Sequence, residues 1–255
     1  MGAITHMEFS VQDLNGNTIA ATAGMEVPDA EIVSVFARSA ADSQIMGTSY
    51  LLKVLDDSDP FYILTASGSR DYALMAAKMV ASQLQSMIAL YKDRLDRGNF
   101  FQNLLLDNLL KVDIYNRARK LHITNLEPRA IIVFDIDPGK SGGNEAETAA
   151  AQLLTGLFVS QGGSYLTQVE ENSVILIKAL DENEGYKEIE EAAMTALDML
   201  NMEAMVNARG SYGTIVGELK DLSRSYKEAR MAMDVGRIFY AGKRVISYNE
   251  LGIGR

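Results

Sequence analysis

The stretch DYALMAAKMVASQLQSMIALYKDRLDR, residues 71–97, contains neither proline nor glycine and predicts one long helix. At about 1.5 Å per residue, this helix would extend over roughly 40 Å. Some of its apolar residues repeat at alternating spacings of three and four, which is the heptad pattern of helices that pair along a seam. The predicted dimer seam consists of Leu74, Ala77, Ala81, Leu84, Ile88, Tyr91 and Leu95.

Other apolar residues make this stripe wider than a strict seam; they are Met75, Met79, Val80, Met87 and Leu90. A wide stripe suits a helix that makes two contacts. We expect one side to pack on a sheet of the same chain and the other to pair with a second copy in parallel. An ordinary amphipathic helix that lies across the first sheet is the alternative.

The segment before this helix, residues 8–70, predicts a small sensor domain. Asn15-Gly16-Asn17 is a strong hairpin signal. Strands are expected at 8–12, 18–23, 50–55 and 61–66, and a helix at 29–43. A small sheet, one helix and a long helix after it form the outline of a PAS-like or GAF-like module. Residues 1–7 read as the remnant of a tag and are excluded from the expected fold.

Residues 71–124 are expected to form the signalling and dimerisation helices. Gly98 predicts the end of the long helix as a C-terminal cap, and Asn99 predicts the start of the next one. That second helix has a dense apolar face, and Asp113 is expected to cap a third, short helix through residues 115–121.

Residues 125–250 predict a second domain in the order βαββαβαβ. Strands are expected at 129–135, 165–170, 173–180, 204–208 and 244–247, helices at 145–160, 186–200 and 217–239, and a glycine-rich loop at 138–144. This order suggests a mixed, largely antiparallel sheet with helices on one face. The expected fold class is therefore α+β. Polymerase palms and nucleotide cyclases share this outline, but an outline does not give activity.

Composition excludes several functions. The formal net charge of −10 opposes binding to DNA phosphates. The absence of cysteine excludes disulfides, thiolate metal sites and cysteine nucleophiles, and it fits a reducing cytosol. The most apolar long stretch, 72–91, is too polar to span a bilayer, so we expect a cytoplasmic protein without membrane contact. His122 is the one histidine outside the tag-like segment, so a Ser-His-acid triad would have to be built around it. It is interpreted as a helix-end residue.

The segment NFFQNLLLDNLL at 99–110, followed by DIYNRARKLHI at 113–123, resembles the linker of the CdaR/PucR family of bacterial regulators of sugar-diacid use and purine catabolism. The resemblance continues through GTIV at 213–216, SYKEAR at 225–230 and YNELGIG at 248–254. It implies a second domain that resembles a GGDEF domain, the diguanylate cyclase fold, but lacks activity. It also implies a helix-turn-helix domain after it, so we expect this chain to stop before its DNA-binding part.

An active cyclase would need a metal site that this sequence lacks in part. The first strand of the second domain ends Asp135-Ile136-Asp137, and Asp135 corresponds loosely to a metal-binding carboxylate of active cyclases. The corresponding hairpin turn, VEENS at 169–173, lacks the glycine pair that lets a backbone approach the nucleotide. We therefore expect no enzyme, no metal and no cofactor. Asp135 and Asp137 are interpreted as solvated strand-end residues.

The sequence thus predicts the sensor and dimerisation region of a bacterial transcription regulator. A small metabolite would bind residues 8–70 and alter the pairing or tilt of the long helix. The resemblance implies sugar diacids or purine-breakdown products, but Arg38, Lys53 and Arg70 are the only cations available there, which weakens the diacid hypothesis. A nucleotide-binding or nucleotide-cyclising GGDEF-like protein and a constitutive dimerisation scaffold are the alternatives. DNA would be bound only through the domain beyond this chain.

Overall fold

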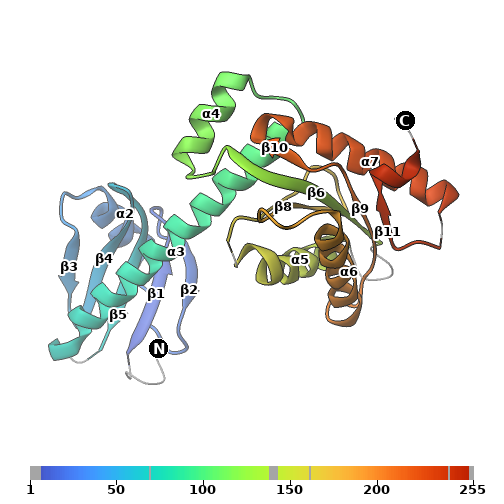
Figure 1. The fold of residues 1–255 in the computed structure, drawn as a ribbon. Coiled ribbons are helices and arrows are strands. Elements are labelled where there is room, and N and C mark those ends of the chain that lie inside the picture. The colour runs from blue at the N-terminus through green and yellow to red at the C-terminus, as the bar shows by residue number, and fades with distance from the viewer. Residues whose placement is uncertain (1–6, 69, 138–142, 161, 241, 253–255) are drawn as a thin grey trace. The chain divides into compact units, whose positions relative to one another are not determined.

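The computed structural model describes residues 7–68, 70–137, 143–160, 162–240 and 242–252. The chain divides into two compact units, Met1–Asp93 and Arg94–Arg255 (Figure 1). An N-terminal sheet, long helices and a second mixed unit follow one another along the chain, so the expected α+β class is confirmed. Within the described ranges, no helix combines the length and apolarity needed to cross a bilayer.

The N-terminal unit contains a five-stranded antiparallel sheet in the order β2-β1-β5-β4-β3. Its strands are β1 (Glu8–Gln12), β2 (Thr18–Ala21), β3 (Ser43–Met46), β4 (Ser49–Asp56) and β5 (Asp59–Ser67). The predicted hairpin is confirmed: the Asp13 carboxylate accepts hydrogen bonds from the backbone N–H groups of Asn15 and Asn17, which closes the turn between β1 and β2. Helix α2 (Ala30–Arg38) connects β2 to β3.

The predicted helix at 29–43 is too long. Helix α2 ends at Arg38, because Ser39 adopts an extended backbone and donates both its N–H and its hydroxyl to the Phe36 carbonyl oxygen. Residues 43–46 form strand β3, which the sequence did not predict. Strand β3 lies at the edge of the sheet, and its first three residues are exposed, so its sequence lacks the apolar alternation of a half-buried strand.

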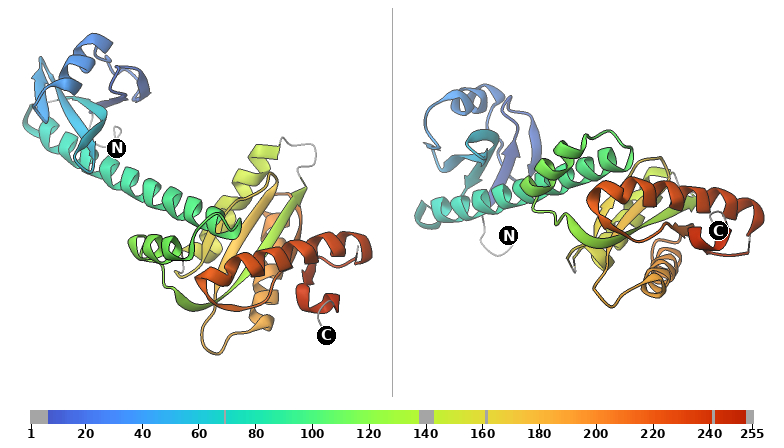
Figure 2. Two further views of the ribbon diagram at one scale, coloured as in Figure 1. Left: turned by 90° about the horizontal axis from the view of Figure 1, so that it is seen from above. Right: turned by 45° about the horizontal axis from the view of Figure 1, so that its top comes forward.

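Helix α3 runs from Arg70 to Leu105 without a break, as its ribbon in Figure 2 shows. The predicted cap at Gly98 is therefore wrong. A glycine inside a helix costs about 1 kcal/mol relative to alanine. Here Phe100 and Phe101, which follow Gly98 in the same helix, are buried in the core of the C-terminal unit. Burial of two such side chains outweighs the cost of the glycine.

Helix α3 covers one face of the N-terminal sheet. Of the predicted seam, Leu74, Ala77, Ala81, Leu84 and Ile88 pack against residues of that sheet. Tyr91 and Leu95 are 71% and 52% exposed. Met75, Met79, Met87 and Leu90 are 57–69% exposed. The helix therefore does present two apolar sides, but the heptad residues mostly contact their own sheet. Of the wider set, Val80 also packs on that sheet and the other four residues are exposed.

The C-terminal unit contains a six-stranded sheet. Along β11-β9-β6-β8-β7 the strands pair antiparallel except for β11 with β9, and β10 pairs with β6. Its strands are β6 (Leu126–Asp137), β7 (Tyr165–Thr167), β8 (Ser173–Ala179), β9 (Asn207–Tyr212), β10 (Val216–Glu218) and β11 (Val245–Ser247). Its helices are α4 (Lys111–Lys120), α5 (Gly143–Leu154), α6 (Tyr186–Met202) and α7 (Leu222–Phe239).

Most of these elements match the prediction, with shifted ends. The strand predicted at 204–208 begins instead at Asn207, and the helix predicted at 217–239 begins instead at Leu222, after strand β10 and a short 3-10 turn. The helix predicted at 145–160 ends in a π-helical turn, Thr155–Val159. The predicted glycine-rich loop lies outside the described residues, except that Gly143 and Asn144 belong to α5.

The prediction of helices on one face is wrong, because they cover both. Helices α5 and α6 pack on Ala130, Ile132 and Phe134, whereas α4, α7 and the end of α3 pack on Ile131 and Val133 (Figure 1). Successive residues of a strand point to opposite faces, so an unbroken apolar run requires cover on both sides.

Close contact between α7 and the sheet depends on Gly213. A Cβ atom at this position would lie 2.0 Å from the Ser225 carbonyl oxygen of α7. We expect Gly213→Ala to lower the free energy of unfolding by about 3 kcal/mol, since backbone must move to relieve the overlap. Gly217→Ala is the control: its Cβ would meet no atom within 4 Å, and we expect a change below about 1 kcal/mol. Equal losses in urea unfolding would contradict this account.

Candidate functional site

The structure brings Asp135 and the predicted hairpin together at one end of the sheet. Strands β6 and β8 are neighbours, and Asp135 lies opposite Ser173. The backbone N–H of Ile136 donates to the Asn172 carbonyl oxygen at 2.8 Å, which fixes the hairpin turn beside the strand end. Asn172 adopts the left-handed conformation at φ 57°, a turn conformation that asparagine tolerates well. The predicted hairpin is therefore confirmed, although β7 is shorter than expected.

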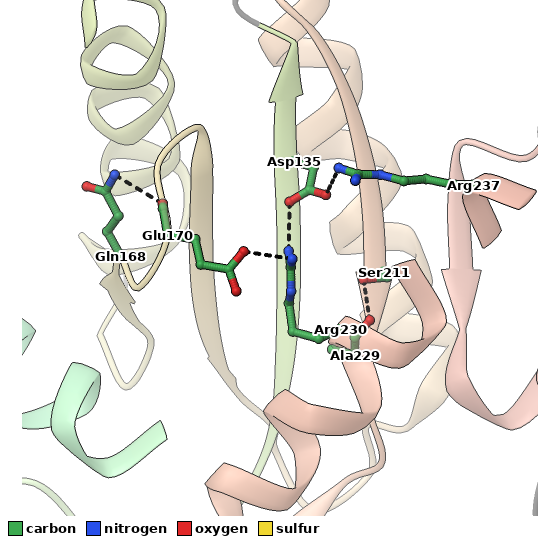
Figure 3. A network of polar contacts seen from close by, with 7 residues as sticks. All are labelled: Asp135, Gln168, Glu170, Ser211, Ala229, Arg230 and Arg237. Atoms are coloured by element: carbon green, nitrogen blue, oxygen red, sulfur yellow. Dashed lines mark hydrogen bonds and ion pairs between the residues drawn. The ribbon is translucent and has the colours of Figure 1, made fainter. Parts of the chain in front are cut away.

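Two arginines of α7 bind the Asp135 carboxylate (Figure 3). Arg230 Nη1 lies 3.0 Å from one carboxylate oxygen, and Arg237 Nη2 pairs with the other. Arg230 also reaches the hairpin, where its Nη2 lies 2.7 Å from Glu170 Oε2. Arg230 therefore bridges the two carboxylates. The Asp135 side chain is only 13% exposed, so the expectation that it is a solvated strand-end residue is wrong.

Helix α7 is positioned for these contacts by hydroxyl side chains where it packs on the sheet, one on α7 and one on β9. The Ser225 hydroxyl accepts from the Ile131 N–H and donates to the Thr214 carbonyl oxygen. The Ser211 hydroxyl donates to the Ala229 carbonyl oxygen at 2.8 Å, next to Arg230 (Figure 3). Arg230 and Arg237 are seven residues apart, close to two helical turns, so both lie over the same end of β6.

Tyr226 completes the network one turn before Arg230. Burial, together with the negative charge of Glu170, which accepts its hydrogen bond, raises the pKa of Tyr226 to about 12. The phenol is therefore protonated and donating at neutral pH. The network thus contains two carboxylates, two guanidinium groups and one neutral hydroxyl, and its positive and negative charges balance.

This arrangement does not fit a metal ion. A metal at this strand end would need the oxygens of Asp135 and the hairpin acids as ligands. Both oxygens of Asp135 and one of Glu170 are bound instead by guanidinium groups. Among the described residues, no three acidic or histidine side chains gather closely enough to hold a metal ion. Asp137, the other predicted strand-end acid, is exposed.

Sequence reasoning found Asp135 and Glu170 but missed Arg230, Arg237 and Tyr226. The spacing of the two arginines along a predicted helix was visible. Their partner Asp135, however, is 95 and 102 residues away, and nothing local connects them.

A family model described as the GGDEF-like domain matches residues 107–235, just over half of the chain. The chain belongs to the GGDEF-like domain family. The match covers α4, α5, α6, α7 up to residue 235 and every strand of the C-terminal sheet except β11, so the GGDEF-like domain holds Asp135, the hairpin and Arg230. A comparison with curated proteins finds no match.

The bridging role of Arg230 can be tested by stability. We expect Arg230→Gln to lower the free energy of unfolding by about 2 kcal/mol, because two carboxylates lose a charged donor. Arg244→Gln is the control: its ion pair with Asp198 is about half exposed, and such pairs contribute less than about 1 kcal/mol. Urea unfolding followed by circular dichroism measures both. An equal effect of the two changes would show that the bridge does not stabilise the domain.

Proposed function

We propose that this chain is the sensor and dimerisation region of a bacterial transcription regulator of the CdaR/PucR type. In this proposal the GGDEF-like domain transmits a signal and does not catalyse a reaction. The observation that carries it is the pair of arginines on Asp135. Metal-dependent phosphoryl chemistry needs carboxylates free to hold the ion. Here guanidinium groups supply the positive charge from within the fold, which supports a structural role for Asp135.

A site for the effector is proposed on the N-terminal sheet, beneath α2. On the face of the sheet that α2 covers, three polar side chains are at most 1% exposed: Ser10, Gln12 and Thr65. Their oxygens Ser10 Oγ, Gln12 Oε1 and Thr65 Oγ1 have no hydrogen-bond partner among the described residues. Ser10 and Thr65 lie directly opposite each other in the β1–β5 pair. A buried polar group left unpaired costs about 1–3 kcal/mol, so the cluster favours a bound polar molecule.

Polar contacts at both ends of α2 couple such a site to the helix. Before α2, Gln12 Nε2 donates to the carbonyl oxygens of Gly16 and Pro28. After α2, Lys53 Nζ donates to the Ser39 carbonyl oxygen and lies 5.5 Å from the centre of the Phe36 ring. The Lys53 side chain is buried, and both of these contacts are uncharged. A buried ammonium of this kind favours a carboxylate ligand, which strengthens the diacid hypothesis over a neutral purine product.

The effector proposal is tested by removing one unpaired hydroxyl. We expect Thr65→Val to stabilise the ligand-free chain by about 1 kcal/mol, since an unsatisfied polar group is lost. We also expect it to abolish the stabilisation of about 2.7 kcal/mol that a ligand at 100 times its Kd gives the wild type. The measurement is a thermal-shift panel of sugar diacids, purine catabolites, and GTP with and without Mg²⁺. Thr167→Val is the control, because the Thr167 hydroxyl is satisfied by the Gly98 carbonyl oxygen and its loss destabilises.

The outcomes separate the alternatives. A shift with one metabolite class, lost in Thr65→Val but kept in Thr167→Val, supports the regulator. A Mg²⁺-dependent shift with GTP, followed by turnover, would instead establish a nucleotide enzyme. A dimer that responds to no metabolite would favour the constitutive scaffold.

A second copy of the chain is proposed as the partner of α3. The side of α3 that points away from its sheet exposes Met75, Met79, Met87 and Leu90. Methionine side chains adapt to a partner surface, and four large apolar residues exposed along one side of a helix favour such a contact. DNA contact is assigned to another domain of the regulator, because 34 acidic residues outnumber 24 basic ones here. The absence of cysteine supports a cytoplasmic location.

Dimerisation through this stripe predicts a clear response to charge. We expect Met79→Glu to convert the dimer to a monomer in sedimentation velocity, because the carboxylate would be buried unpaired at the contact. Ala89→Glu is the control: Ala89 is exposed on the same helix, one residue and so about 100° away from Leu90. A Met79→Glu chain that stays dimeric would rule out this stripe as the main contact.

A further inference from the structure

We infer that the C-terminal unit carries a second binding site, for the phosphate group of a small molecule, in a cleft beside the Asp135 network. The cleft has a volume of about 670 Å³. It lies where β6 ends and β9 begins, and α6 and the segment from α7 to β11 complete its walls. No residue of the hairpin turn at 168–172 is among the described residues that line it. This inference goes beyond the proposed function, because the effector site there lies in the N-terminal unit.

The cleft is basic within an acidic unit. Residues 94–255 include 19 basic and 23 acidic side chains, a net charge of −4. Among the described residues, the cleft is nevertheless lined by four cations, Arg209, Arg237, Lys243 and Arg244, against two acids, Asp135 and Asp137. Asp135 is already neutralised by Arg230 and Arg237. The concentration of positive charge in a concave surface is what attracts a multiply charged anion.

Two of these cations are held in place by acids that do not line the cleft. Arg244 Nη1 lies 2.7 Å from Asp198 Oδ1, and Lys243 Nζ lies 3.0 Å from Glu250 Oε2. These ion pairs are about half exposed, so each contributes little stability. Each pair orients its cationic side chain and uses only part of that side chain's N–H donors. A guanidinium has five N–H donors and an ammonium three, which leaves several to point at a ligand.

The donor set favours phosphate over a monocarboxylate. Guanidinium groups bind phosphate through paired hydrogen bonds, and several cations around one anion match a charge of about −2. Asn201 and Asn207 also line the cleft and can donate to the rest of a ligand. Leu197 and Ala208 supply a small apolar wall. The site therefore fits a compact organic phosphate.

The test is calorimetric titration of the full chain with sodium pyrophosphate and inorganic phosphate, with sodium chloride at equal ionic strength as the reference. We expect saturable binding of pyrophosphate. The double variant Lys243→Gln/Arg244→Gln should lose about tenfold or more in affinity, because two charged donors are removed. The matched control is Lys187→Gln/Lys227→Gln, which removes two exposed, ion-paired cations of the same unit outside the cleft and should bind as the wild type does.

Unchanged affinity in the double variant, or no binding beyond the chloride reference, would overturn the site. Malonate binding as tight as that of pyrophosphate would overturn the assignment of phosphate. Arg209→Gln provides an independent second variant and should also weaken binding. The Thr65→Val chain should bind pyrophosphate normally, so the failure of this inference and the failure of the effector proposal are distinguishable.

Discussion

Strand β6 buries every residue from Arg129 to Phe134, and its neighbour β8 buries every residue from Ser173 to Ile177. Each face of this pair must be covered by helices, since a strand apolar on both sides cannot face water on either. Helix α7 meets this requirement on one face, and Gly213 opposite Ser225 lets it approach closely. The approach in turn places Arg230 and Arg237 over the end of β6. The charge network is therefore a consequence of how the core is closed.

Charge then decides what the strand end can do. A carboxylate as buried as that of Asp135 is stable only with a compensating charge, which a metal ion or a cationic side chain can provide. A metal ion would leave coordination positions open for a nucleotide. Here two guanidinium groups on α7 compensate the Asp135 charge, and they are part of the fold. Arg230 also joins the strand end to the hairpin through Glu170. Such a network ties α7, the strand end and the hairpin together, which is compatible with the transmitting role proposed for the domain.

The sequence predicted what is encoded locally. The Asn15-Gly16-Asn17 turn follows from residues in direct contact, and the helical spacing of residues 71–97 follows from one periodicity. It could not tell which apolar side of α3 meets the sheet, because both sides satisfy the same spacing. The predicted helix end at Gly98 was wrong for a different reason. The cost of a glycine within a helix is small compared with the gain from burying Phe100 and Phe101 in a core formed by distant strands. Asp135 was identifiable at a strand end, but its arginine partners depend on the tertiary fold.

The two proposed sites differ in physical character, and Arg237 couples the second of them to the Asp135 network. The cluster beneath α2 is buried, so a ligand there gains from pairing oxygens that have no partner among the described residues. The cleft is open and cationic, so its affinity must fall as ionic strength rises. Arg237 lines the cleft and also binds Asp135. An anion that took Arg237 fully would leave Asp135 to Arg230 alone, at a cost that offsets the gain. Anion binding should therefore depend mainly on Arg209, Lys243 and Arg244. The part of the binding free energy that Arg237 contributes measures how strongly the cleft is coupled to the Asp135 network.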